Sequence, residues 1–220
     1  MLVLEAHEIK KTFQQGKQSV QVLNGISLGL ERGEIVTLEG PSGSGKTTLL
    51  SILGCILTPT VGKIMIEGSE TDSRRLADIR KKSIGFVFQQ FNLFPALTAL
   101  ENVEYALNIK GMKGPEAKRE ATRSLDSVGL AERKSFLPRD LSGGQKQRVA
   151  VARALAGNSA IVLADEPTAN LDSHTGMQIL ALFRDLAKQE NRALLIVTHD
   201  SKVREISDRV LRIRDGLLID

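Results

Sequence analysis

The sequence has few of the residues that mark several common classes of protein. It contains one cysteine, Cys55, and no tryptophan, and aromatic residues make up only 4% of the chain. A single cysteine excludes an internal disulfide framework and favours a reducing compartment. No stretch approaches the roughly 18 apolar residues that a membrane-spanning helix needs, and charge comes too early at the N-terminus for a signal peptide. We therefore expect a soluble intracellular protein.

The charge balance is mildly basic and does not indicate a nucleic-acid partner. Lysine and arginine number 30 against 26 acidic residues, which gives a net charge of +4. The basic residues are scattered among acids, and aromatic side chains that could stack on bases are scarce. This pattern is typical of a solvated surface of mixed charge. The hydrophobic fraction of 41% over 220 residues is enough to bury one substantial core.

Short apolar runs alternate with helical patterns, which indicates an α/β fold with a parallel sheet. Strands are expected at 2–9, 35–38, 61–67, 84–88, 160–163, 193–197 and 209–213, and helices from Gly45 to Pro59 and over about 173–190. The stretch from about 95 to 157 has a helical pattern, with Pro115 suited to a first helical position. We expect a single domain over 1–220. Residues 1–90 and 158–220 would form its core, and about 91–157 would form a helical insert.

A glycine-rich loop lies between an expected strand and an expected helix. It reads Gly40-Pro41-Ser42-Gly43-Ser44-Gly45-Lys46-Thr47 and matches the pattern G-x-x-x-x-G-K-[ST] in full. Its glycines let backbone N–H groups turn toward phosphate oxygens, and the helix adds its positive N-terminal end. Lys46 is placed to reach the β- and γ-phosphates and Thr47 to ligate Mg²⁺. The loop therefore predicts a phosphate site.

Two acids follow the apolar run 161–164, at the end of an expected strand. They are Asp165 and Glu166, and ligands bind at the carboxyl ends of strands in a parallel sheet. Acids also commonly solvate strand ends, but the phosphate loop upstream favours a functional interpretation. We expect Asp165 to bind Mg²⁺ and Glu166 to act as the general base for an attacking water.

A second anion site is expected at Leu141-Ser142-Gly143-Gly144-Gln145, which opens a strongly helical stretch. Ser142 is a good N-cap, and the two glycines leave backbone N–H groups bare at the helix end. An ordinary capped helix start is the less favoured alternative for this segment taken alone.

Together with the phosphate loop, that pentapeptide resembles the signature of ATP-binding cassette (ABC) ATPases. The resemblance covers nearly the whole chain, with its motifs in order. By this resemblance, Asp165 and Glu166 correspond to the Walker B acids. Gln89 in FVFQQ corresponds to the Q-loop glutamine, Asp172 in ANLD to the D-loop, and His199 in VTHD to the switch histidine.

The resemblance implies a P-loop NTPase fold of the RecA-like type. Its parallel-sheet core would carry an antiparallel β subdomain and an inserted α-helical subdomain. It also implies ATP and Mg²⁺ as cofactors, and a sandwich in which residues 141–145 of one copy complete the ATP site of a second copy. The catalytic residues would be Glu166, His199 and Gln89, and the metal would be held by Thr47, Gln89 and Asp165. ATP would contact Phe13, Gly40, Pro41, Ser42, Gly43, Ser44, Gly45, Lys46, Thr47 and Thr48.

Two of these assignments have an alternative. Phe13 is the candidate for stacking on adenine, although tyrosine is commoner there, and it is also consistent with a packed strand residue. Gln89 is followed by Gln90, and Gln89 is preferred because it directly follows the strand FVF.

A cassette without a membrane span needs a membrane partner if it works in transport. The apolar stretch Phe91–Pro95 is a candidate groove for a helix of such a permease, or else packs within the helical part. Residues 88–103, 163–176 and 209–216 resemble the cassettes of macrolide-exporter and lipoprotein-releasing systems. That resemblance implies an exporter or mechanotransmission ATPase, peripheral on the cytoplasmic face of the inner membrane.

Two other kinds of ABC ATPase are alternatives to a transport cassette. A cell-division ABC ATPase would signal through its membrane partner without transport. A DNA-repair ABC ATPase is disfavoured because the sequence has neither heptads nor cysteine clusters.

Overall fold

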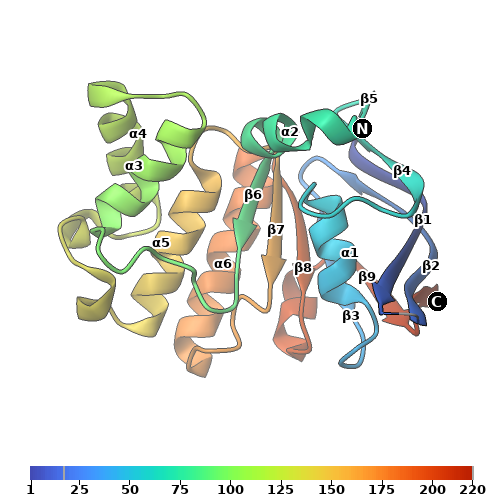
Figure 1. The fold of residues 1–220 in the computed structure, drawn as a ribbon. Helices are drawn as coiled ribbons and strands as arrows, with labels where there is room; N and C mark the ends of the chain where they lie inside the picture. The colour runs from blue at the N-terminus through green and yellow to red at the C-terminus, as the bar shows by residue number, and fades with distance from the viewer. Residues whose placement is uncertain (17, 220) are drawn as a thin grey trace.

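The structure is a computed structural model that describes residues 1–16 and 18–219 (Figure 1). Its strands are β1 (Leu2–Gln15), β2 (Gln18–Glu31), β3 (Ile35–Glu39), β4 (Val61–Ile66), β5 (Ser69–Glu70), β6 (Ile84–Val87), β7 (Ile161–Asp165), β8 (Ala193–Val197), β9 (Arg209–Arg214) and β10 (Leu217–Ile219). Its α-helices are α1 (Lys46–Leu53), α2 (Leu76–Ser83), α3 (Ala99–Ile109), α4 (Gly114–Ser127), α5 (Gly143–Leu155) and α6 (Ser173–Glu190). Short 3₁₀ turns lie at Ser73–Arg75, Ala131–Arg133, Pro138–Asp140 and Ser201–Ile206.

Two sheets organise the molecule. The larger has six strands in the order β10-β9-β3-β8-β7-β6, and all neighbours except β10 and β9 pair in parallel. The smaller is antiparallel, with the order β2-β1-β4-β5. Figure 1 shows α1 between the two sheets and α3, α4 and α5 at the opposite end of the molecule. The expected combination of a parallel-sheet core, an antiparallel β part and a helical part is confirmed.

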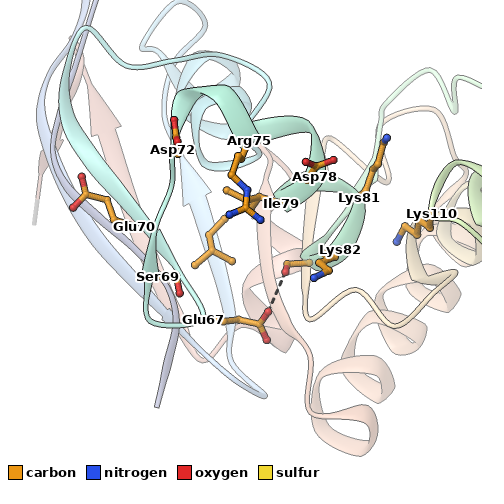
Figure 2. A pocket seen from close by; sticks show the side chains of 12 residues that line it. Glu67, Ser69, Glu70, Asp72, Arg75, Asp78, Ile79, Lys81, Lys82 and Lys110 are labelled. Atoms are coloured by element: carbon orange, nitrogen blue, oxygen red, sulfur yellow. Dashed lines mark hydrogen bonds between the residues drawn. The ribbon is translucent and has the colours of Figure 1, made fainter.

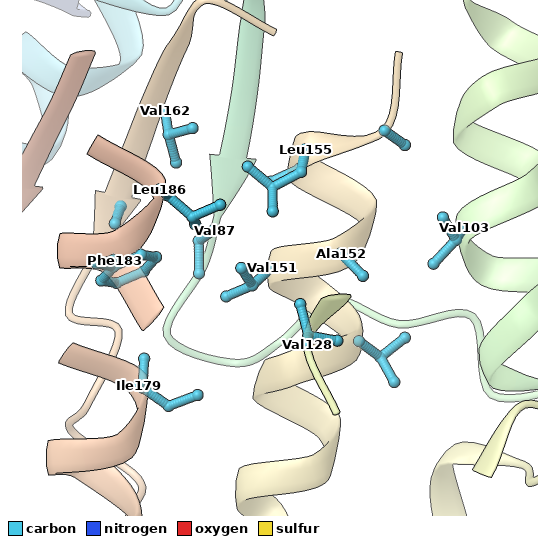
Figure 3. Close-up of a cluster of buried hydrophobic side chains, with 14 of the residues drawn as sticks. Val87, Val103, Val128, Val151, Ala152, Leu155, Val162, Ile179, Phe183 and Leu186 are labelled. Atoms are coloured by element: carbon cyan, nitrogen blue, oxygen red, sulfur yellow. The ribbon is translucent and has the colours of Figure 1, made fainter. Parts of the chain in front are cut away.

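The central strands are apolar along their whole length because both of their faces are covered. In β7, Val162 packs on one side with α5 and α6, whereas Ile161 and Leu163 pack on the other side with α1 and the antiparallel sheet. Figure 3 shows the first of these clusters, where Val151 and Leu155 of α5 lie near side chains of α6 and of the sheet. Because successive side chains of a strand point to opposite faces of the sheet, the same strands contribute to two hydrophobic cores, one on each face.

Most of the predicted elements are confirmed. Helix α6 has the predicted bounds, and strands lie at each predicted run, although β1 continues to Gln15 rather than ending near residue 9. Pro115 lies in the first turn of α4, as predicted. The predicted helix from Gly45 to Pro59 is wrong at its end, because α1 stops at Leu53. Gly54 packs directly on the ring of Phe86, where a Cβ would overlap the ring, and Cys55 has a positive φ of 57° that no α-helix continues.

Strands β2, β5 and β10 and helix α2 were not among the predicted elements. The segment of β2 contains Gly25 with a φ of 101° and has no clear alternation of buried and exposed residues. Its place is decided by pairing with β1 rather than by its own pattern. Across the described residues 1–16 and 18–219, none of the helices combines the length and the apolar character that crossing a membrane requires.

The contact between α5 and β6 gives a test of the packing. A Cβ on Gly85 would overlap the backbone carbonyl oxygen of Ala154, which cannot move without displacing α5. We expect Gly85→Ala to lower the free energy of unfolding by about 1–3 kcal/mol, as measured by denaturant titration. Gly176→Ala is the control, because a Cβ there meets Thr168 only at 3.8 Å. If Gly85→Ala left the free energy of unfolding unchanged, the close packing of α5 on β6 would be contradicted.

Candidate nucleotide site

The phosphate loop joins the end of β3 to the start of α1. Gly45 directly precedes the helix with a φ of 103°, a left-handed conformation that only glycine adopts easily. At the other end of the loop, a Cβ on Gly40 would overlap the carbonyl oxygen of Ile213. The loop is therefore confined between β9 and the start of α1, with its backbone free of side chains at both ends.

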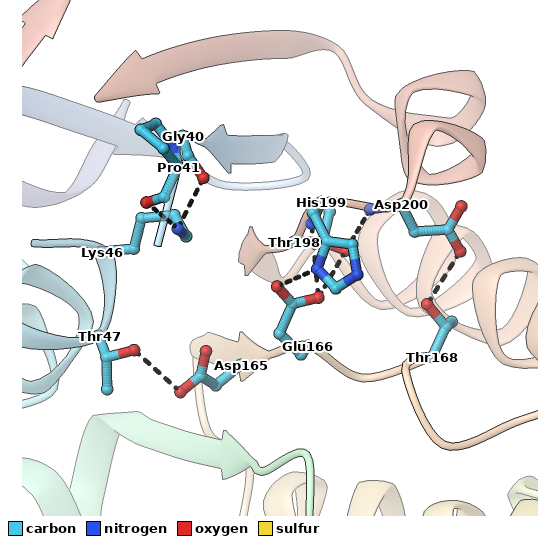
Figure 4. Close-up of polar contacts among 10 residues, drawn as sticks. All are labelled: Gly40, Pro41, Lys46, Thr47, Asp165, Glu166, Thr168, Thr198, His199 and Asp200. Carbon is cyan, nitrogen blue, oxygen red and sulfur yellow. Dashed lines mark hydrogen bonds and ion pairs between the residues drawn. The ribbon is translucent and has the colours of Figure 1, made fainter. Parts of the chain in front are cut away.

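Lys46 folds back over this loop. Its Nζ donates to the carbonyl oxygens of Gly40 at 2.7 Å and of Pro41 at 2.9 Å (Figure 4). The ammonium group thus lies over the loop, where the phosphates are expected. The next residue, Thr47, points its Oγ1 toward Oδ2 of Asp165, 3.5 Å away.

The two acids at the end of β7 point in different directions. Asp165 ends the strand, and Glu166 turns away with a φ of 47°, its backbone N–H donating to the carbonyl of Val197 at 2.8 Å. Burial, reinforced by the neighbouring charge of Glu166, raises the pKa of Asp165, and the hydrogen bond from Thr47 offsets part of this rise. The ionised Asp165 carboxylate therefore lies where a positive charge would stabilise it.

Glu166 is held by residues that follow β8. His199 Nδ1 lies 2.7 Å from its Oε1, and the hydroxyl of Thr198 donates to its Oε2 at 3.0 Å (Figure 4). The side chain of Glu166 is 15% exposed, whereas His199 is 76% exposed. Thr198 was not among the predicted site residues, although a hydroxyl beside the histidine at a strand end was a usable signal.

These groups share one hollow. It is lined by Val22, Ser42, Gly43, Gly45, Lys46, Thr47, Thr48, Gln89, Asp165 and Glu166. The structure thus brings together the phosphate loop, both acids and Gln89 from distant parts of the chain. The backbone carbonyl of Gln89 accepts from Nδ2 of Asn170 at 2.8 Å, a contact that the sequence analysis did not predict.

Phe13 does not line this hollow. It lies in β1 opposite Val20, and Nζ of Lys11 lies 5.0 Å from the centre of its ring. The ring is 36% exposed, so it is not a packed strand residue. Val22, in the strand paired with β1, lines the hollow instead.

The segment 141–145 lies in a different hollow. The side chain of Ser142 accepts from the backbone N–H of Gln145 at 3.3 Å, and Gln145 Oε1 accepts from the N–H of Ser142 at 3.0 Å, which confirms the predicted N-cap. A Cβ on Gly144 would overlap Thr175 of α6. Ser142, Gly144 and Gln145 line this hollow, and none of them reaches the one around Lys46.

Asp172 caps α6 beside the segment 141–145. Its Oδ1 accepts from the backbone N–H of Thr175 at 3.0 Å, and its Oδ2 accepts from the Thr175 hydroxyl at 2.6 Å. The residue packed against Gly144 is therefore the one that Asp172 holds.

A further hollow lies between α2 and the antiparallel sheet (Figure 2). Acids and bases line it together, and Glu67 in its wall is already bound by Arg32 at 2.7 Å and by Ser83 at 3.0 Å. It has no glycine-rich loop and no excess of positive charge, so it does not suit a triphosphate.

Several known proteins are similar to this chain in both sequence and fold. Residues 23–169 match the ABC transporter family. The ATP-binding protein of the lipoprotein-releasing system of Porphyromonas gingivalis is 44% identical over 99% of both chains. A macrolide export ATP-binding/permease protein of Mannheimia succiniciproducens is 42% identical, over the full length of this chain and 34% of its own. The ATP-binding cassette MJ0796 of Methanocaldococcus jannaschii, solved as a dimer bound to ADP and Pi, matches with a TM-score of 0.90 and 42% identity over 99% of this chain and 97% of its own.

The chain belongs to the ABC transporter family.

As a member of this family, the cassette binds and hydrolyses ATP. The predicted resemblance to macrolide-exporter and lipoprotein-releasing cassettes is confirmed. The alternative of a cell-division ATPase is not favoured by these relatives.

The position of Lys46 gives a test of where the cassette binds nucleotide. Lys46→Ala removes the charge that lies over the phosphate loop, and charge-assisted hydrogen bonds to phosphate are among the stronger ones. We expect the affinity for ATP, measured by calorimetry, to fall by about tenfold or more. Lys63→Ala, an exposed lysine of β4, is the charge-matched control. Unchanged ATP affinity in Lys46→Ala would place the phosphates elsewhere.

Proposed function

We propose that the cassette is one half of a sandwich of two copies, which closes around two Mg²⁺-ATP and drives a transmembrane permease. The observation that supports this most directly is the separation of the two anion sites. The phosphate loop and Ser142 lie in different hollows of one chain, so Ser142 does not line the phosphate-loop hollow of its own chain. A second copy would supply the missing wall of each site.

The oxygen atoms near the phosphate loop suit Mg²⁺. The hydroxyl of Thr47 and the carboxylate of Asp165 face each other, and Gln89 lines the same hollow. Magnesium prefers oxygen ligands and usually combines one or two protein groups with phosphate oxygens. A cation here would offset the burial and the repulsion that raise the pKa of Asp165. When bound, Mg²⁺ would supply positive charge to the phosphates.

The remaining site residues have distinct tasks in this proposal. The N–H groups and side chains of residues 40–48 hold the phosphates, and Phe13 approaches the adenine from the β1–β2 hairpin. Glu166 takes the proton from the attacking water as general base. His199 and Thr198 keep its carboxylate pointed toward the γ-phosphate, and both bonds to Glu166 support that task. Asp172 orders the loop that faces the second copy.

An apolar groove offers a place for the permease. Phe86 and Phe88 of the β6 region and Tyr105 and Ile109 of α3 line it, and Phe94 is 45% exposed beside them. Arg153 of α5 also lines the groove and donates to the backbone carbonyl of Phe91 at 2.8 Å. Movement of a helix in this groove would therefore reach the segment that follows Gln89.

The segment Phe91–Pro95 contributes both to the packing of the helical part and to the wall of the groove. Leu93 packs against the helical core, whereas Phe94 faces the groove. In this proposal, residues 1–90 and 158–220 form the ATP-binding core and 91–157 the part that the permease moves. Two relatives carry names of lipoprotein-releasing and macrolide-export systems. They support an exporter or mechanotransmission role at the cytoplasmic face of the inner membrane.

The general-base assignment predicts a separation of binding from turnover. Glu166→Gln keeps the size of the side chain and one acceptor oxygen, but removes its negative charge and its basicity. We expect ATP to bind and to accumulate a stable dimer in gel filtration, while hydrolysis falls by about 100-fold. Glu205→Gln, an exposed acid that does not line the hollow around Lys46, is the control. Near-normal hydrolysis by Glu166→Gln would exclude this residue as the base.

The sandwich itself predicts that the signature acts in the other copy. Ser142→Arg places bulk and charge at the surface where the second copy's ATP would lie, without touching the phosphate loop. We expect ATP affinity of the chain to stay within about twofold and the ATP-dependent dimer to disappear in light scattering. Ser127→Arg, at the exposed end of α4, is the control. An undiminished dimer in Ser142→Arg would refute the cross-site arrangement.

A further inference from the structure

A buried glutamine lies beneath the signature segment and is not part of any motif discussed above. Gln147 belongs to α5, five residues after Ser142, and its side chain is 0% exposed. Its Nε2 donates to the backbone carbonyl of Pro167 at 2.8 Å. Pro167 directly follows Glu166, so this one bond joins the signature helix to the turn that carries the proposed general base.

The amide is poorly suited to a purely structural role. Its Oε1 is buried and has no hydrogen-bond partner among residues 1–16 and 18–219. Burying an amide oxygen without a donor costs free energy, and an apolar side chain of similar shape would avoid that cost. What the amide supplies, and an apolar side chain would not, is a donor for the buried carbonyl of Pro167.

Gln147 is also well placed to transmit movement. Ser142 and Gln147 lie on the first turns of one continuous helix, so a displacement of the cap carries the glutamine with it. At the cap, Gly144 packs on Thr175, which Asp172 holds. At the far side, the turn at Glu166 is fixed to β8 through Thr198 and His199. The Gln147–Pro167 bond lies between these two fixed groups.

We propose that Gln147 is a positioning residue that couples the two ATP sites of the sandwich. Through its bond to Pro167, docking of Ser142 on the second copy's ATP would orient Glu166 at the ATP held by its own chain. Hydrolysis at one site would then depend on closure at the other. This inference rests on the proposed sandwich and adds a path between its two sites.

The test uses Gln147→Met, which keeps the length and approximate volume of the side chain and removes the Nε2 donor together with the unpartnered Oε1. ATP affinity, the ATP-dependent dimer, kcat, KM and the Hill coefficient of hydrolysis are measured on the full chain. We expect affinity, dimer and KM to stay as in the wild type and kcat to fall by about tenfold, since small misplacements of reacting groups are costly. We also expect the Hill coefficient to fall from a value above 1 toward about 1.

A second variant keeps the inference testable if the methionine destabilises the core. In Gln147→Glu, only the protonated carboxyl can donate to the Pro167 carbonyl, and burial favours the protonated form. Its kcat relative to the wild type should therefore rise as the pH is lowered. A ratio that stays low and does not change with pH would overturn the inference, because a role in packing alone does not require a donor.

Ser159→Ala is the matched control for the loss of a buried hydrogen bond. Ser159 is also 0% exposed and accepts from Lys110 Nζ at 2.7 Å, but it lies before β7, at the end of the sheet away from Glu166. We expect Ser159→Ala to lower the free energy of unfolding and to leave the Hill coefficient of hydrolysis unchanged. If the wild type forms the ATP-dependent dimer and Gln147→Met keeps its kcat and Hill coefficient, the inference is wrong and the sandwich stands. If the wild type forms no such dimer, the sandwich fails and the inference fails with it.

Discussion

The parallel register of β3, β7 and β8 is the constraint on which the site depends. Leu38 and Asp165 both pair with Val197, so the three strands end at the same level of the sheet. The segments that leave these ends carry the phosphate loop, Glu166 and His199. No flexible segment has to bring the groups together, because the sheet has already placed them within hydrogen-bonding distance.

The arrangement of the two acids at this edge of the sheet costs free energy of folding, and the sheet tolerates it because both of its faces are covered by apolar side chains. Two hydrophobic clusters, one on each face, pack against the same central strands. At the edge, Asp165 is partly buried beside another acid, and Glu166 has a positive φ. Such local strain persists only where the surrounding structure holds it, and it is typical of sites that bind charged ligands.

Much of the site was predictable because its motifs are short and their chemistry is local. The loop 40–47 needs glycines and a lysine in a fixed order, and Ser142 caps a helix whose start is visible in the sequence. The end of α1 was not predictable from Pro59, because the chain leaves the helix earlier, where Gly54 packs on Phe86 and Cys55 has a positive φ. Phe13 remains a prediction, since the ring lies outside the hollow that the other residues line.

The sequence alone determined the family, the alternation of strands and helices, and the residues at the phosphate loop and strand ends. The family follows from the resemblance that the ordered motifs carry, whereas the strands, the helices and the local site residues follow from neighbours along the chain: periodicity, capping and the spacing of glycines. Only the tertiary structure decided that Thr198 holds Glu166, that Asn170 holds the Gln89 segment and that Gln147 holds Pro167. These bonds join residues distant in sequence, and their existence depends on strand register and helix packing, which no local pattern records. Strand register and helix packing also decide where Ser142 lies relative to Lys46. The sequence predicts an anion site at each, and the fold places the two residues in different hollows.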